Sequence, residues 1–152
     1  MKMRKIIFKL YQILPRKTVN YIGSINSLKS VRNFFLKNKN LYKTVKTNIS
    51  LIYQEYKVNF NFFAPIKVAA RAKRGGIESI LIKNSIKLIK KYTIMDNDAV
   101  VLDIGANFGY LSMVWSKSIS KNNGKIYGFE PSRFVFENFE KTIKVNNSQQ
   151  LI

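Results

Sequence analysis

The alternation of hydrophobic and polar positions predicts a strand–helix–strand unit between residues 99 and 131. The run at 99–102 (AVVL) is continuously apolar, which is typical of a short strand buried on both faces. A turn of small residues follows, and apolar residues then recur at helical spacing up to residue 120. Residues 125–129 (KIYGF) predict a second strand, which ends at Glu130. We expect the two strands to be parallel and joined by a right-handed crossover.

The segments around this unit predict further elements. We expect an amphipathic helix at 1–14, a short helix at 30–37, a β-hairpin at 49–63, a loop at 71–74, a helix at 77–92, a turn at 96–98, a helix from 133 to Asn146 and the start of a third strand at 149–152. The fold class is therefore α/β. The predicted parts are a basic helical segment (1–48), a hairpin with a lead-in helix (49–98) and an incomplete parallel sheet of Rossmann-like type (99–152).

The turn after the first strand predicts a nucleoside site. Gly105 and Gly109 allow a sharp turn and a close approach of the backbone to a ligand. Glu130, at the end of the second strand, is placed to accept hydrogen bonds from ribose hydroxyls. The G-x-G-x-x-G pattern of dinucleotide sites is absent, and Asp103 would repel a diphosphate but attract an ammonium or sulfonium group. These features favour S-adenosylmethionine over NAD.

Two motifs resemble the FkbM family of S-adenosylmethionine-dependent methyltransferases: DIGANFGY at 103–110 and GKIYGFEP at 124–131. The segments 71–78 (RAKRGGIE) and 138–147 are similar to the flanking parts of that family, so the resemblance covers about residues 60–152. It implies a class I methyltransferase fold and O-methylation of a sugar, lipid-linked glycan or natural-product hydroxyl, without a metal.

The resemblance also implies a set of donor-binding residues. Those at the methionine end of the donor would be Asp103, Gly105, Asn107 and Gly109, with Glu78 nearby. Glu130 would hold the ribose, and Pro131 and Ser132 would flank the adenine. Each residue also has a purely structural interpretation, such as a glycine at a helix entry or an acid near a helix N-terminus. Their combination at this spacing favours ligand binding, whereas Tyr110 and Trp115 are expected in the core.

The composition limits the chemistry. The chain has no cysteine and no histidine, which excludes disulfides, thiolate metal sites and the commonest general base. No catalytic residue is identified, and no metal site is expected. No segment approaches the roughly 20 apolar residues of a membrane span, so we expect a cytoplasmic protein, with the membrane surface as a further site of attachment.

Positive charge is concentrated in the first part of the chain. Residues 1–92 carry 21 Lys and Arg against 2 acids, whereas residues 93–152 carry 6 of each, which together give the net charge of +19. The excess indicates a polyanionic neighbour: an anionic membrane contacted through Met1–Lys17, a phosphorylated glycan, or, less favoured, nucleic acid. A surface that only keeps the chain soluble is the open alternative.

The chain supplies only the first strands of a class I methyltransferase sheet, without the later loops that would contact an acceptor. We therefore expect the N-terminal, donor-binding portion of a longer methyltransferase that acts on a small molecule, glycan or lipid. Two alternatives remain: a non-catalytic remnant or interaction module, and a basic nucleic-acid-binding protein or RNA methyltransferase fragment.

Overall fold

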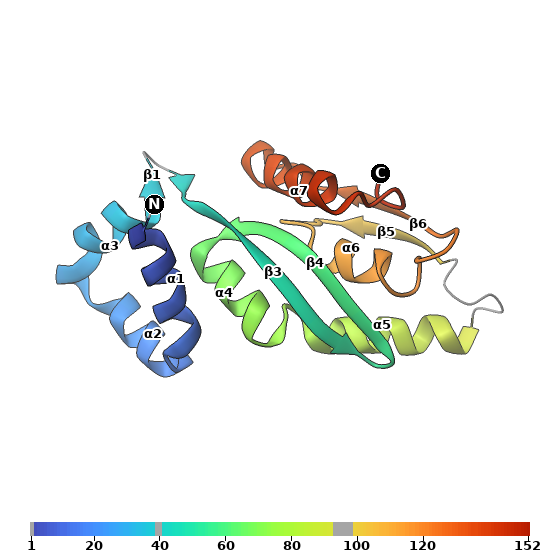
Figure 1. Ribbon diagram of the computed structural model, residues 1–152, viewed down its shortest axis with the longest axis horizontal. Helices are drawn as coiled ribbons and strands as arrows, with labels where there is room; N and C mark the ends of the chain where they lie inside the picture. The colour runs from blue at the N-terminus through green and yellow to red at the C-terminus, as the bar shows by residue number, and fades with distance from the viewer. Residues whose placement is uncertain (1, 39–40, 93–98) are drawn as a thin grey trace.

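A computed structural model describes residues 2–38, 41–92 and 99–152 and has a mixed α/β architecture (Figure 1). The first elements are α1 (Lys2–Ile13), α2 (Arg16–Ser24), the one-turn 3-10 helix η1 (Asn26–Leu28), α3 (Lys29–Leu36), β1 (Lys37–Asn38) and β2 (Leu41–Tyr42). The central elements are β3 (Thr44–Tyr53), β4 (Tyr56–Pro65), α4 (Ile66–Gly75) and α5 (Ser79–Tyr92). The last are β5 (Val100–Ile104), α6 (Tyr110–Ser116), β6 (Lys125–Phe129) and α7 (Arg133–Asn146).

The long hairpin of β3 and β4 forms the middle of the molecule (Figure 1). Its strands are antiparallel, with pairing from Thr44 opposite Pro65 to Tyr53 opposite Tyr56. The predicted hairpin is confirmed, although β3 begins five residues earlier than the expected boundary at residue 49. Alternate side chains enter the core because successive residues of a strand point to opposite faces. The buried ones include Ile49, Tyr53, Val58, Phe60 and Phe62.

Helix α7 protects the free edge of β4. The side chain of Asn146 accepts a hydrogen bond from the Asn61 amide (2.8 Å) and donates one to the Asn61 carbonyl (2.7 Å). The Thr142 hydroxyl accepts a hydrogen bond from the Phe63 amide at 3.1 Å. These side chains satisfy backbone groups that a third strand would otherwise pair, so the part of the edge at Asn61 and Phe63 is covered within the chain.

The predicted strand–helix–strand unit is confirmed. Strands β5 and β6 are parallel, in register from Val100 opposite Lys125 to Ile104 opposite Phe129, and α6 lies between them in the chain. Leu151 makes a parallel bridge to Ile126, as expected for the start of a third strand.

The expectation that the first strand is buried on both faces is wrong. Val100, Leu102 and Ile104 are 68%, 65% and 74% exposed, whereas Asp103 on the opposite face is buried. Side chains alternate between the faces of a strand, and the described elements cover only one face of β5. A continuous apolar run shows that a strand could be buried on both faces, but it does not show whether other elements cover both faces.

Two helices differ from the sequence-based expectation. Residues 71–74 form part of α4 rather than a loop. Alanine has a strong helix propensity, but the buried face of α4 is made mainly of alanines and therefore gives only a weak hydrophobic pattern in the sequence. The unpredicted α2 begins at Arg16, directly after Pro15, which is its N-cap residue and makes no side-chain capping bond. Helix α1 and the end of α7 at a left-handed Asn147 are confirmed. The expected turn at 96–98 lies outside the described residues.

In the part of the chain that the structure describes, no helix is both long enough and apolar enough to cross a membrane.

The buried ring of Phe139 packs between the turn after β5 and strand β6. A Cβ atom added at Gly109 or at Gly128 would overlap this ring. Gly109 also has a φ of 77°, in the left-handed region that glycine adopts most readily. The absence of a side chain at Gly109 and Gly128 therefore leaves the space that the Phe139 ring of α7 occupies against the βαβ unit.

We expect Gly109→Ala to lower the free energy of unfolding by roughly 2–5 kcal/mol, since overpacking against Phe139 adds to the backbone strain. Gly105→Ala is the matched control, because Gly105 has a φ of 80° but no atom within 4 Å of an added Cβ. Its loss should be about 1–2 kcal/mol. Urea unfolding of both variants measures the difference, and equal losses would show that Phe139 packing does not set the cost.

Candidate functional site

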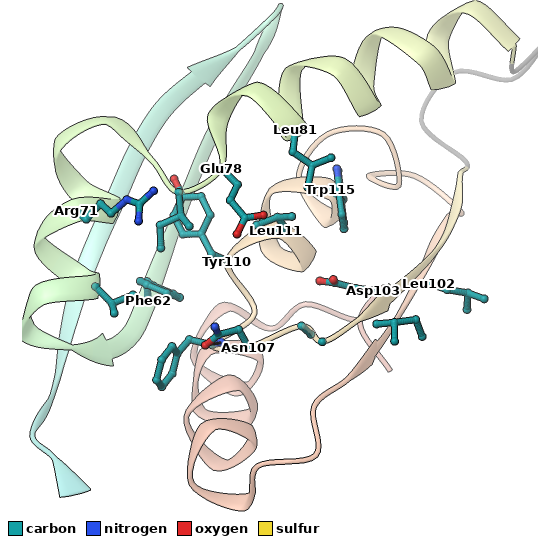
Figure 2. A pocket seen from close by; sticks show the side chains of 16 residues that line it. Phe62, Arg71, Glu78, Leu81, Leu102, Asp103, Asn107, Tyr110, Leu111 and Trp115 are labelled. Carbon is teal, nitrogen blue, oxygen red and sulfur yellow. Dashed lines mark hydrogen bonds between the residues drawn. The ribbon is translucent and has the colours of Figure 1, made fainter.

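A cavity of about 550 Å³ lies where the turn after β5 meets the connection between α4 and α5 (Figure 2). Its size is within the range of small-molecule sites. Four polar side chains line it: Arg71, Glu78, Asp103 and Asn107. Apolar walls come from several elements, among them Phe62, Leu81, Tyr110, Leu111 and Trp115. The site is therefore assembled from the hairpin, α4, α5, β5 and α6.

Asp103 is a buried acid in the wall of this cavity. Its side chain is on the covered face of β5, with the residue 8% exposed, and it accepts a hydrogen bond from the Ser112 hydroxyl of α6. Burial raises the pKa of Asp103, and the negative charge of Glu78 raises it further, while the hydrogen bonds from Ser112 act in the opposite direction. An ionised carboxylate here lowers the stability of the folded chain unless a positive charge lies nearby.

Glu78 lies just before α5 in a strained backbone conformation. Its φ is 50°, in the left-handed region that is unusual for a glutamate. Asn107 has a φ of 54° and lines the same cavity, although asparagine tolerates this region better. Figure 2 shows the side chains of Glu78 and Asp103 on the same cavity, one from each side. The interpretation of Glu78 as an acid within the first helical turn is wrong, because α5 begins at Ser79.

A pair of buried tyrosines supports the Glu78 segment. The hydroxyls of Tyr53 and Tyr110 share a hydrogen bond of 3.0 Å, and burial raises the pKa of Tyr110. A Cβ atom at Gly76, where φ is 79°, would overlap the Tyr53 hydroxyl. Gly76 therefore allows the chain to pass directly over this pair and to place Glu78 two residues later. Tyr110 is a core residue, as predicted, and it also forms part of the cavity wall.

Trp115, like Tyr110, belongs to the core and also lines the cavity. It is buried, and its indole Nε1 donates a hydrogen bond of 2.9 Å to the Ser85 hydroxyl of α5. Because Trp115 belongs to α6, this bond ties the two helices together beside the cavity. The sequence indicated its place in the core, but no local signal indicated that it lines the site.

Glu130 organises the turn at the other side of the βαβ unit. Its carboxylate accepts hydrogen bonds from the backbone amides of Asn107 (3.0 Å) and Ser132 (2.9 Å). The Phe129 carbonyl accepts hydrogen bonds from the amides of Gly105 and Ala106, both at 2.9 Å. The end of β6 thus holds the glycine turn in place through backbone amides.

The structure gathers some of the predicted site residues and not others. Glu78, Asp103, Gly105 and Asn107 all line the cavity. The residues that do not line it are Gly109, Glu130, Pro131 and Ser132. Gly109 contacts Phe139 below the turn, and Ser132 precedes α7 without a side-chain capping bond. The binding roles of all eight residues stay predictions.

Arg71 is the charged cavity residue that the sequence-based predictions missed. The sequence-based assignment put it in a loop, whereas α4 brings it to the cavity wall opposite β5 (Figure 2). The available signal was its spacing of four residues from Lys67, which places both on one face of a helix. With Arg71 included, the site offers one positive and two negative side chains, a set that suits a zwitterionic ligand.

The comparisons with known proteins find similarity among solved structures, where two chains match. No family model and no curated protein matches the chain. Among solved structures, a protein-L-isoaspartate O-methyltransferase is similar, with a TM-score of 0.40 and 14% sequence identity. The match covers 98% of this chain and 40% of that protein, so the chain spans less than half of that protein's length.

Asp103 should give the folded chain a distinct pH dependence. Because its pKa is raised on folding, the folded chain binds more protons than the unfolded chain, and its stability decreases as the pH rises through the folded-state pKa. We expect Asp103→Asn to lose less stability than the wild type between about pH 4, near the unfolded value, and neutral pH.

Thermal unfolding across this pH range measures the effect. Glu140→Gln, which removes a carboxylate on α7 that is paired with Lys144, is the control and should keep the wild-type slope. A wild-type slope in Asp103→Asn would contradict the prediction.

Proposed function

We propose that the chain is the donor-binding part of an S-adenosylmethionine-dependent methyltransferase of the FkbM type. The observation that carries this proposal is the convergence of two unfavourable features on one cavity. Asp103 is a buried acid with a raised pKa, and Glu78 has a left-handed backbone. Each lowers folding stability, and such features cluster where a ligand is bound. A cation between the two carboxylates would offset both.

The methyl donor fits this set of residues. Its ammonium and sulfonium groups are the cations that Asp103 and Glu78 attract, and its carboxylate suits the Arg71 guanidinium. Glu130 uses its oxygens for two backbone amides and keeps lone pairs for ribose hydroxyls. Following the resemblance, Pro131 and Ser132 flank the adenine. The walls of the cavity, Phe62 and Trp115 among them, exclude water from the bound molecule.

The contribution of this chain to methyl transfer is therefore positioning. The donor supplies, when bound, an electrophilic methyl carbon on a positive sulfur. Asp103, Glu78 and Arg71 hold the charged end of the molecule, so the reacting carbon has a fixed position relative to the acceptor oxygen. We propose a hydroxyl of a sugar, lipid-linked glycan or natural product as the acceptor. The base that takes its proton is not assigned to a residue of this chain.

Calorimetric titration of the chain with S-adenosylmethionine tests the proposal, with NAD as the competing ligand class. We expect micromolar binding of the methyl donor alone. Glu78→Gln should weaken it by roughly tenfold, since a charge-assisted bond is lost. Glu140→Gln, which removes a distant carboxylate of the same kind, should leave it unchanged.

Glu78→Gly separates binding from folding. Glycine adopts the left-handed conformation without strain, so this variant should be at least as stable as the wild type while binding the donor more weakly. A folded wild-type chain that does not bind the donor, or equal effects of Glu78→Gln and Glu140→Gln, would contradict the proposed function.

We also propose an anionic membrane surface as a partner of the N-terminal helices. Residues 1–48 contain 12 Lys and Arg and no acid. Helix α1 exposes Ile6, Leu10 and Ile13, which share one face because they are spaced by four and three residues. An exposed apolar face in a segment rich in positive charge suits the interface of an anionic bilayer.

Ile13→Glu tests the membrane proposal, because Ile13 is 77% exposed and its replacement should leave the fold intact. Binding to phosphatidylglycerol vesicles should decrease several-fold, and phosphatidylcholine vesicles should not bind either protein. Ile52→Glu on the hairpin, at a residue 68% exposed, is the matched control and should bind as the wild type. Equal losses in the two variants would contradict a specific role of α1, and steeply salt-dependent RNA binding would favour the nucleic-acid alternative.

A further inference from the structure

A second cavity, of about 330 Å³, lies next to the first between α4 and the helices α1 and α2. Three of its lining side chains are positively charged: Lys67, Arg71 and Arg74. Among the residues that the structure describes, no carboxylate lines it. The three residues all belong to α4, at spacings of four and three residues, so they share one face of the helix. The second cavity is therefore a positively charged cleft built on a regular element.

The positive side chains of this cleft, Lys67, Arg71 and Arg74, form no ion pair with an acid in the part of the chain that the structure describes. Like charges three and four residues apart destabilise a helix, so the arrangement is unfavourable without an anion. Arg74 has a structural task as well, since its guanidinium donates hydrogen bonds to the carbonyls of Tyr11 and Leu14 at the end of α1.

Lys67 and Arg71 are the two positive side chains of the cleft that we expect to contact a ligand, since Arg74 is bonded to α1. The Lys67 ammonium lies 5.9 Å from the centre of the Tyr11 ring, and 3.9 Å from the position of a Cβ atom on Gly23. The Lys67 charge therefore lies next to both α1 and α2, while the residue itself is exposed. Arg71 lines both cavities. A group bound in the cleft would therefore lie beside the proposed donor site.

We propose that this cleft binds a phosphate or diphosphate group, and that the group belongs to the methyl acceptor. A guanidinium binds phosphate oxygens in a two-pronged geometry, and an ammonium adds a point charge. The phosphate site itself stands on the cleft and its charges, whereas its assignment to the acceptor rests on the proposed methyl transfer. Arg71 would then contact both the acceptor phosphate and the donor carboxylate, and so bring the two molecules together.

Titration of the full chain with inorganic diphosphate, without the methyl donor, tests the phosphate site. We expect saturable binding that Lys67→Gln weakens by roughly tenfold. Lys73→Gln is the matched control, because Lys73 belongs to the same helix and loses the same charge but does not line the cleft. It should change the affinity by less than about twofold, as expected for a screened surface charge. Arg71→Gln should weaken binding as Lys67→Gln does, which provides a second variant if one is poorly folded.

Absent saturation, or equal effects of Lys67→Gln and Lys73→Gln, would overturn the phosphate site. S-adenosylmethionine is titrated separately into the same preparation. Diphosphate binding that depends on Lys67, without donor binding, would leave the phosphate site standing and refute the methyl-transfer role. Donor binding without diphosphate binding would refute the phosphate site alone.

Two soluble probes distinguish the sources of the phosphate group. One is a sugar phosphate and the other a short-chain lipid phosphate, and the tighter ligand identifies the class of acceptor. Lys67→Gln should weaken both, because both present the same group to the cleft. Retention of full affinity for both probes in Lys67→Gln would count against the proposal.

Discussion

The hydrogen bond between the hydroxyls of Tyr53 and Tyr110 is the contact on which the arrangement of the site depends. It joins the tip of the hairpin to the start of α6, and the Tyr110 ring packs edge-on against Phe60 and Phe62 at 5.5 and 5.4 Å. Gly76 lets the α4–α5 connection cross directly above the pair. The positions of α4, α5 and the turn after β5 are thereby linked, and the cavity lies where these elements meet. A buried hydroxyl pair is specific because removing either partner costs the other a hydrogen bond inside the core.

Left-handed backbone serves two different purposes in this chain. At Gly76 and Gly109 it serves packing, since a side chain there would overlap Tyr53 or Phe139. At Glu78 and Asn107 it occurs in residues whose side chains line the cavity. Together with the buried Asp103, these positions lower stability at one place in the molecule. Such a concentration is the physical basis for interpreting the cavity as a binding site.

Helix α4 lies between the strongly basic part of the chain and the cavity that contains the acidic side chains. The N-terminal helices and α4 carry much of the positive excess, whereas the βαβ unit is close to neutral. Arg74 fixes α1 to α4 through backbone carbonyls, and Arg71, one turn earlier, lines both cavities. Helix α4 therefore connects the basic helices to the acidic site, and a single side chain reaches both environments. This connection underlies the proposed meeting of an anionic acceptor with a cationic donor.

The sequence by itself determined the local elements: the hairpin, the parallel βαβ unit and the long helices, because residue periodicity and glycine turns act over a few neighbouring positions. It also indicated Asp103, Gly105 and Asn107 as neighbours around one turn. Only the tertiary structure decided that α4 is a helix whose Arg71 faces the cavity, that Glu78 is left-handed, and that one face of β5 is exposed. The reason is that these features depend on which surfaces meet, and contacts between the hairpin, α4 and α6 join segments far apart in the chain.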